Sequence, residues 1–199
     1  MLRMLLVRHG ESMGNVDRKF SGYTDDELST LGKEQAKKVA ARLREEKIAA
    51  VYASDLTRAY DTAAAIAAEH GLPVEKIPGL REINFGDWDG VLAAEITAKW
   101  GEELARWRED PLLVRAPGGE TYTEVKERFL TALESIAARH QDGTVAVVTH
   151  GGPIAALYCG LLQKRFYECA VPNTAVCELE FGPEGVKAVS HGDARHLEG

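Results

Sequence analysis

Four segments of this chain place a cation, an imidazole or a carboxyl group just beyond an apolar run. The groups are Arg8 with His9, Arg58, Glu82, and His150. The clearest runs are Met4–Val7 and TVAVVT at 144–149, which are typical of strands buried on both faces. Because ligands bind at the carboxyl ends of parallel strands in an open α/β sheet, we expect these four segments to converge in one crevice.

Two guanidinium groups, two imidazoles and one carboxyl group in a crevice suit a phosphoryl group. Arg8 and Arg58 would supply planar, permanently charged donors that match phosphate oxygens. The carboxylate of Glu82 would repel a dianion, so we assign it proton transfer to and from an ester oxygen. A neutral histidine can attack phosphorus and give a phosphohistidine that a second acceptor discharges. Each residue alone could be an ordinary surface or strand-end side chain, and only their joint placement favours this chemistry.

The sequence motifs point away from a metal or a bound cofactor. We find no H-E-x-x-H, no closely spaced Asp/His set and no G-x-x-x-x-G-K-[ST] loop. Cys159, Cys169 and Cys177 have no C-x-x-C spacing, so we expect reduced, structural thiols. His191 and His196 are predicted to lie in a solvated tail. We therefore predict metal-free chemistry with no cofactor.

The periodicity predicts alternating strands and helices. Strands are expected at 4–7, 48–53, 73–78, 144–149, 175–181 and 186–190. Helices are expected over 31–46, from 55 to 70, as two short pieces within 92–108, over 121–140, and after 152. Residues 13–24 are predicted to form an irregular polar loop. The alternation predicts a single α/β domain over residues 1–199, with a mostly parallel sheet and helices on both faces.

The composition of the chain limits the kinds of molecule that it is expected to bind. The formal charge of −7 and the absence of a Lys/Arg run argue against nucleic acid and anionic membrane. No segment has the roughly 20 apolar residues that a membrane span needs, and no secretory signal precedes the first strand, so a cytoplasmic protein is expected. The partner we predict is a small-molecule phosphate ester, and the sequence leaves a homodimer open.

Several sequence blocks together resemble the motif set of the histidine phosphatase superfamily, in its phosphoglycerate mutase-like branch. The blocks are RHGES at 8–12 with Asn15, SDLTRAYDTA at 54–63, LREINFGDWDG at 80–90, THGG at 149–152, PNTAV at 172–176 and GDARHLE at 192–198. They occur in the family's order and span nearly the whole chain. The resemblance implies a three-layer α/β/α sandwich.

The resemblance also implies roles for individual residues. His9 would be the phosphorylated nucleophile, and Glu82 the proton donor and later the base. Arg8, Arg58 and His150 would hold the phosphate. Further phosphate contacts would come from Asn15, Ser21, Gly22 and Gly151.

The acceptor of the phosphoryl group stays open. If water takes the phosphoryl group from the phosphohistidine, the protein is a phosphomonoesterase. If a hydroxyl of a second substrate takes it, the protein is a cofactor-dependent phosphoglycerate mutase. The modest length of Val91–Gly119 favours the phosphomonoesterase. A non-catalytic binding module for phospho-ligands is the third alternative, although it needs neither a nucleophile nor a proton donor. Aromatic residues that would form either an apolar entrance or core are Phe20, Tyr23, Trp88 and Trp107.

Overall fold

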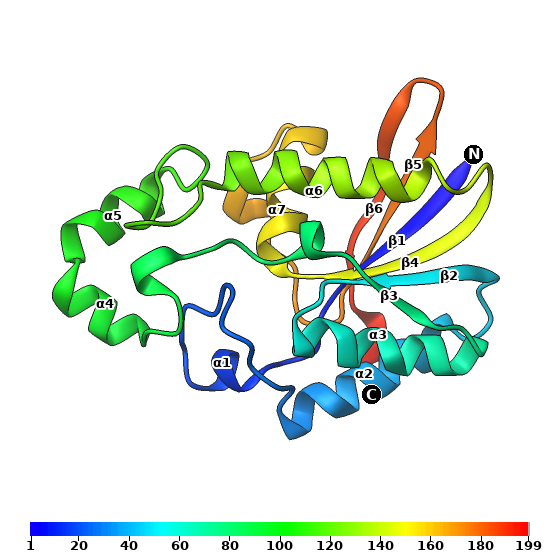
Figure 1. Cartoon of the computed structure of the whole chain (residues 1–199), viewed down its shortest axis with the longest axis horizontal. Coiled ribbons are helices and arrows are strands. Elements are labelled where there is room, and N and C mark those ends of the chain that lie inside the picture. The colour runs from blue at the N-terminus through cyan, green and yellow to red at the C-terminus, as the bar shows by residue number, and fades with distance from the viewer. Residues whose placement is uncertain (199) are drawn as a thin grey trace.

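A six-stranded sheet forms the centre of the computed structural model, which describes residues 1–198 (Figure 1). The strands are β1 (Leu2–Arg8), β2 (Ile48–Ala53), β3 (Val74–Lys76), β4 (Gly143–Thr149), β5 (Val176–Gly182) and β6 (Gly185–Asp193). In the order β3-β2-β4-β1-β5-β6, the first four strands are parallel, and β5 runs antiparallel to both β1 and β6. The predicted, mostly parallel sheet is confirmed.

Helices cover both faces of this sheet, as Figure 1 shows. The seven helices of the described residues are α1 (Met13–Val16), α2 (Thr30–Leu43), α3 (Thr57–His70), α4 (Ala93–Lys99), α5 (Gly101–Glu109), α6 (Tyr122–Ala137) and α7 (Gly151–Leu162). Side chains of β1 point alternately to the two faces. Leu5 and Val7 join a core with α2 and α3, whereas Met4 and Leu6 join a core with α6 and α7. These layers are the α/β/α sandwich expected from the sequence.

Local sequence signals set the helix ends. The Ser29 hydroxyl accepts the amide of Gly32 over 3.0 Å and caps α2. Thr121 and Glu124 form a capping box at the start of α6. Gly71 ends α3 at φ +64°, a left-handed conformation that glycine adopts without steric cost.

A third cluster of buried side chains lies under α4 and α5, beyond the end of the sheet. Trp88 is fully buried and Trp107 is 7% exposed. Phe20 packs against this cluster, with its ring centroid 5.9 Å from that of Trp88. These aromatic residues are therefore core rather than an entrance. Tyr23 instead lies 4.8 Å below the guanidinium of Arg81.

Two expectations from the sequence are wrong. The predicted irregular loop contains α1, because Ser12 and Asn15 form a capping box. The predicted solvated tail is instead tied down: β6 extends to Asp193, and a 3-10 helix follows at Arg195–Leu197. His196 lies with Nδ1 3.2 Å from a guanidinium nitrogen of Arg42 and Nε2 3.0 Å from the hydroxyl of Thr174.

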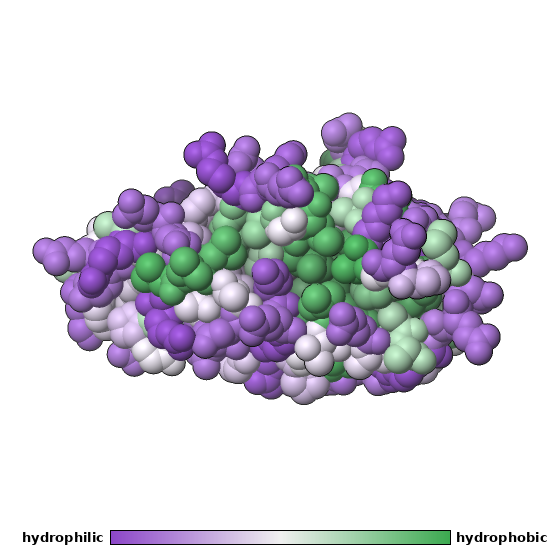
Figure 2. All heavy atoms as spheres, turned by 90° about the horizontal axis from the view of Figure 1, so that it is seen from above, coloured by the Kyte–Doolittle hydropathy of each residue, from purple (hydrophilic) through white to green (hydrophobic). Residues whose placement is uncertain are grey.

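Figure 2 shows a band of apolar side chains across the upper face, where Figure 1 places α6, α7 and the β5–β6 hairpin. Partly buried apolar residues of these elements are Leu130, Ala137, Leu161, Leu162, Phe181 and Val186.

No helix within residues 1–198 is long and apolar enough to cross a membrane. The three cysteines are free and buried.

Candidate active site

The parallel register of β1 and β4 places the two site histidines side by side. Arg8 pairs with Thr149 at the carboxyl ends of the strands, and the amide of His9 donates to the Thr149 carbonyl over 3.0 Å. His9 directly follows β1 and His150 directly follows β4, and their ring centroids lie 5.0 Å apart at an interplanar angle of 63°. Residues far apart in the sequence therefore meet at one edge of the sheet.

The His9 ring presents a single free nitrogen lone pair. Its Nδ1 lies 2.6 Å from the carbonyl oxygen of Gly10. Because a carbonyl only accepts, Nδ1 must carry the proton, which leaves Nε2 unprotonated in the neutral ring. Burial, together with the charges of Arg58 and Arg8, holds the pKa of His9 well below its usual value. The ring is therefore neutral and able to act as a nucleophile near pH 7.

Arg58, in the first turn of α3, is fully buried and held by main-chain carbonyls. Its guanidinium donates to the carbonyls of Thr24, Ser21 and Gly22 at 2.8, 3.1 and 2.8 Å. Two residues expected to contact phosphate, Ser21 and Gly22, thus hold Arg58 through their carbonyls. The hydroxyl of Ser21 is buried with no hydrogen-bond partner in the described chain.

Arg8 is the last residue of β1. One terminal nitrogen donates to the Val171 carbonyl over 2.6 Å. Its Nε is buried without a hydrogen-bond partner within residues 1–198. A Cβ on Gly151 would lie 3.2 Å from that Nε, so Gly151 leaves room beside the guanidinium.

His150 is fully buried and bound on one side only. Its Nε2 lies 2.8 Å from the hydroxyl of Ser54, a residue that the sequence analysis gave no role. Its Nδ1 has no partner among the described residues. Burial and the charges of Arg58 and Arg8 hold the pKa of His150 well below its usual value.

Glu82 approaches the site from the connection after β3. Its carboxyl oxygens accept the amides of Ile83 and Gly152 over 2.9 and 3.1 Å, the latter in the first turn of α7. Burial raises the pKa of this carboxyl, and the two amides, Arg58 and Arg8 oppose that shift. The carboxyl can therefore stay protonated above the usual pH range of a glutamic acid.

A cavity of about 200 Å³ opens beside Glu82. Its lining residues are Arg8, Glu82, Tyr122, Gly151, Gly152, Ala155, Phe166, Ala170 and Val171. Tyr122 and Phe166 lie with ring centroids 4.4 Å apart, so aromatic and small apolar side chains form the wall opposite the charged groups. Burial keeps the pKa of Tyr122 well above its usual value, so its hydroxyl is neutral. A larger hollow, of about 640 Å³, lies among Met1, His140 and Gly182 and contains none of the predicted site residues.

Asn15 is linked to the main chain of His9 through the side chain of Asn173. Its Oδ1 accepts the amide of Ser12 over 3.1 Å, which completes the cap of α1. The side-chain amide of Asn173 lies 3.4 Å from the same oxygen and donates to the His9 carbonyl over 3.0 Å. Asn173, within the PNTAV segment, is thus a site neighbour that the sequence analysis left without a role.

No group of three or more His, Cys, Asp and Glu side chains in the described part of the chain is placed to hold a metal ion. The groups available for chemistry at the site are the guanidiniums of Arg8 and Arg58, two neutral imidazoles, and one carboxyl group whose pKa is raised.

Comparison with known proteins assigns the chain to a protein family. The sequence model of the histidine phosphatase superfamily (branch 1) matches residues 4–194. The chain belongs to the histidine phosphatase superfamily. The family predicted from the motifs is confirmed.

Individual relatives of this histidine phosphatase carry phosphatase names. Phosphoserine phosphatase 1 of Hydrogenobacter thermophilus is 41% identical over 178 residues, which cover 88% of this chain and 84% of the relative. The structure of YhfR from Bacillus stearothermophilus superimposes with a TM-score of 0.93 at 30% identity, covering 100% of both chains. A mycobacterial glucosyl-3-phosphoglycerate phosphatase, solved with VO3, superimposes with a TM-score of 0.87 at 31% identity over 96% of this chain and 99% of that one.

Proposed function

We propose that this protein is a metal-independent phosphomonoesterase that hydrolyses small phosphate esters through a phosphohistidine on His9. The observation that carries the proposal is the bond between Nδ1 of His9 and the Gly10 carbonyl. It leaves Nε2 as the one free ring nitrogen, in a neutral imidazole next to two guanidinium groups. A nucleophile of this kind can capture phosphorus on nitrogen.

In the first step, Nε2 of His9 attacks phosphorus while the bond from phosphorus to the ester oxygen breaks. Glu82, whose pKa is raised by burial, gives a proton from its acid form to the departing oxygen and becomes a carboxylate. Arg8 and Arg58 stabilise the charge on the transferring phosphoryl oxygens. The products are an alcohol and a phosphohistidine.

In the second step, water attacks phosphorus and the bond from nitrogen to phosphorus breaks. The Glu82 carboxylate accepts the proton of the water, so Glu82 returns to its acid form and His9 to its neutral form. Inorganic phosphate is released. Each group ends in its starting state, and the balance needs no metal or redox partner.

The unpartnered buried donors support an anionic ligand. Within the described chain, Nε of Arg8 is a buried N–H without an acceptor, and Nδ1 of His150 is a buried ring nitrogen without a partner. Buried polar atoms of this kind cost free energy unless a ligand satisfies them. A phosphate group placed between the two guanidiniums would supply the acceptors. We propose Asn15, Ser21, Gly22 and Gly151 as further parts of this pocket, with the first three acting through the segments that hold His9 and Arg58.

The test is hydrolysis of p-nitrophenyl phosphate in the presence of a chelator, with vanadate as inhibitor. We expect turnover in the wild type, no turnover in His9→Ala, and an acid-labile phosphoenzyme in the wild type alone. Full activity of His9→Ala would exclude the mechanism.

The alternative acceptor is tested separately. A coupled assay with bisphosphoglycerate would reveal a phosphoglycerate mutase, whereas release of inorganic phosphate without isomerisation supports the phosphatase. Binding of phosphate esters without turnover would indicate a binding module. We further propose that the enzyme acts as a single domain in the cytoplasm on small-molecule esters, independently of nucleic acid.

A further inference from the structure

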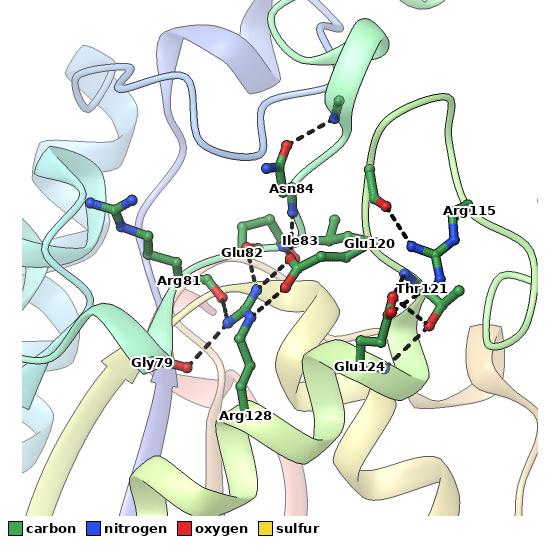
Figure 3. Close-up of polar contacts among 12 residues, drawn as sticks. Gly79, Arg81, Glu82, Ile83, Asn84, Arg115, Glu120, Thr121, Glu124 and Arg128 are labelled. Atoms are coloured by element: carbon green, nitrogen blue, oxygen red, sulfur yellow. Dashed lines mark hydrogen bonds and ion pairs between the residues drawn. The ribbon is translucent and has the colours of Figure 1, made fainter.

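The loop that carries Glu82 is held by a single side chain of α6. The Arg128 guanidinium donates to the main-chain carbonyls of Gly79, Arg81 and Glu82 at 3.1, 2.8 and 2.7 Å. Figure 3 shows this guanidinium between the loop and the helix, with its bonds fanning out to the loop. Arg128 therefore ties the main chain of the loop to α6.

Glu120 completes this tie. Its carboxylate accepts two bonds from Arg128, at 2.9 and 3.0 Å. The same carboxylate accepts the amide of Asn84 over 2.8 Å, and the amide of Glu120 donates to the Asn84 carbonyl over 2.9 Å (Figure 3). The pair thus binds the chain on both sides of Glu82. Only 22% of the Arg128 side chain and 24% of the Glu120 side chain are exposed, so water screens the pair weakly.

Other contacts hold the residues before Glu82: the Arg81 guanidinium pairs with the Asp55 carboxylate at 2.7 and 2.6 Å, and the Thr149 hydroxyl donates to the Leu80 carbonyl over 2.7 Å. Arg128 differs from them because it bonds the carbonyl of Glu82 itself. The preceding strand, β3, has three residues, and only a short 3-10 helix, Pro78–Leu80, lies between it and Glu82. The Glu82 carboxyl reaches the first turn of α7 through its bond to the Gly152 amide. A shift of the loop main chain by a few tenths of an ångström would therefore move the carboxyl relative to an ester oxygen in the cavity.

We propose that Arg128, supported by Glu120, is a positioning residue for the general acid Glu82. The inference rests on the proposed function of Glu82 and goes beyond it. Arg128 is absent from the described residues that line the cavity, so its effect would pass through the loop carbonyls rather than through substrate. It should therefore influence proton donation more than phosphate binding or nucleophilic attack.

The dependence of rate on the leaving group separates these effects. A good leaving group such as p-nitrophenolate departs without a proton, whereas an alkoxide needs one. We expect Arg128→Met to lower kcat/KM for alkyl phosphates by about tenfold or more beyond any loss on p-nitrophenyl phosphate, since general acids contribute roughly 10²–10⁴-fold. A plot of log kcat/KM against leaving-group pKa should become steeper, in the same direction as for Glu82→Gln. Arg128→Lys keeps the positive charge but lacks the forked donors of a guanidinium, so its slope should lie between those of the wild type and Arg128→Met.

The matched control is Arg139→Met, just beyond the end of α6. Arg139 forms an exposed ion pair with Glu75 and contacts no part of the loop around Glu82 in the described structure. This variant should keep the wild-type slope. Circular dichroism and thermal unfolding would check that each variant is folded, and if Arg128→Met does not fold, Arg128→Lys and Glu120→Gln decide on the same slope.

The outcomes distinguish the two proposals. A steeper slope in Glu82→Gln and in the Arg128 variants supports the positioning role. A steeper slope in Glu82→Gln with equal losses for all esters in the Arg128 variants overturns the positioning role and leaves the general acid intact. An unchanged slope in Glu82→Gln overturns the acid assignment itself.

Discussion

The side-chain amide of Asn173 donates a hydrogen bond to the main-chain carbonyl of His9 over 3.0 Å. The next residue strengthens this link: Thr174, which is fully buried at φ +56°, donates its amide to the carbonyls of Arg8 and His9 at 2.9 and 3.3 Å. The turn before β5 therefore fixes the backbone of His9, the proposed nucleophile. Since the proposed mechanism has His9 approach phosphorus in line with the leaving oxygen, small shifts of this backbone should lower the rate.

Asn173→Ala should lower kcat more than it raises KM. The substitution leaves the His9 carbonyl without one of its donors, and a lost buried hydrogen bond costs about 1–3 kcal/mol. The expected loss in kcat is about tenfold. Steady-state kinetics and the amount of acid-labile phosphoenzyme would measure it, and wild-type values for both would contradict the positioning of His9 by Asn173.

Gly152→Ala should abolish activity while Gly160→Ala should not. Both glycines belong to α7, but a Cβ on Gly152 would overlap the Glu82 carboxyl and the Tyr122 ring, whereas a Cβ on Gly160 meets nothing within 4 Å. Gly160→Ala should also stabilise the helix by about 0.5–1 kcal/mol. Kinetics and thermal unfolding of the two variants provide the comparison, and an active Gly152→Ala would exclude the tight packing around Glu82.

Arg58→Lys should weaken phosphate binding. The Arg58 guanidinium donates to three main-chain carbonyls at once, and the ammonium group of a lysine cannot reproduce this planar arrangement of donors. Loss of a charge-assisted contact costs about 1.5–3 kcal/mol, so kcat/KM should fall roughly 10- to 100-fold and the inhibition constant of inorganic phosphate should rise. Arg44→Lys, which alters only a surface ion pair with Glu69, is the control and should change neither value.

Stability should fall as the solution becomes mildly acidic. His9 and His150 have folded-state pKa values well below 6.5, so below about pH 6.5 the unfolded chain binds more protons than the folded one. The stability contributed by the neutral histidines is present above that pH and is lost as pH falls toward their folded pKa values. Replacing His150 by Gln should reduce this pH dependence by up to about 1.4 kcal/mol per pH unit. Urea unfolding between about pH 8 and pH 5.5 would test it, and identical slopes in the variant and the wild type would contradict it.

The sequence predicts the sheet well where the signal is local and strong. The run Ile48–Ala53 is β2 with the predicted bounds, and TVAVVT lies within β4, because strands buried on both faces are continuously apolar. Residues 13–16 escaped prediction, since glycine and asparagine are typical of loops and the short helix depends on the cap between Ser12 and Asn15.

Site residues were predictable to the extent that they follow strands. Arg8, His9 and His150 stand at carboxyl ends, which the topology of parallel sheets brings together. Ser54 and Asn173 were not assigned roles because each contacts a histidine of the site that lies far along the chain, 96 positions away for Ser54 and 164 for Asn173. Arg128 bonds the Glu82 loop through main-chain carbonyls, which any sequence could present, so no side-chain pattern in that loop marks the contact.

The register between β1 and β4 also limits how this gene can change over time. Insertion or deletion of one codon between Met4 and His9 would rotate every following side chain of the strand to the opposite face, and the His9 imidazole would lose its contact with His150, the residue after β4. The segment from α4 to α5 has no comparable pairing to the sheet, so length variation among descendants should accumulate there and leave the two strand ends untouched.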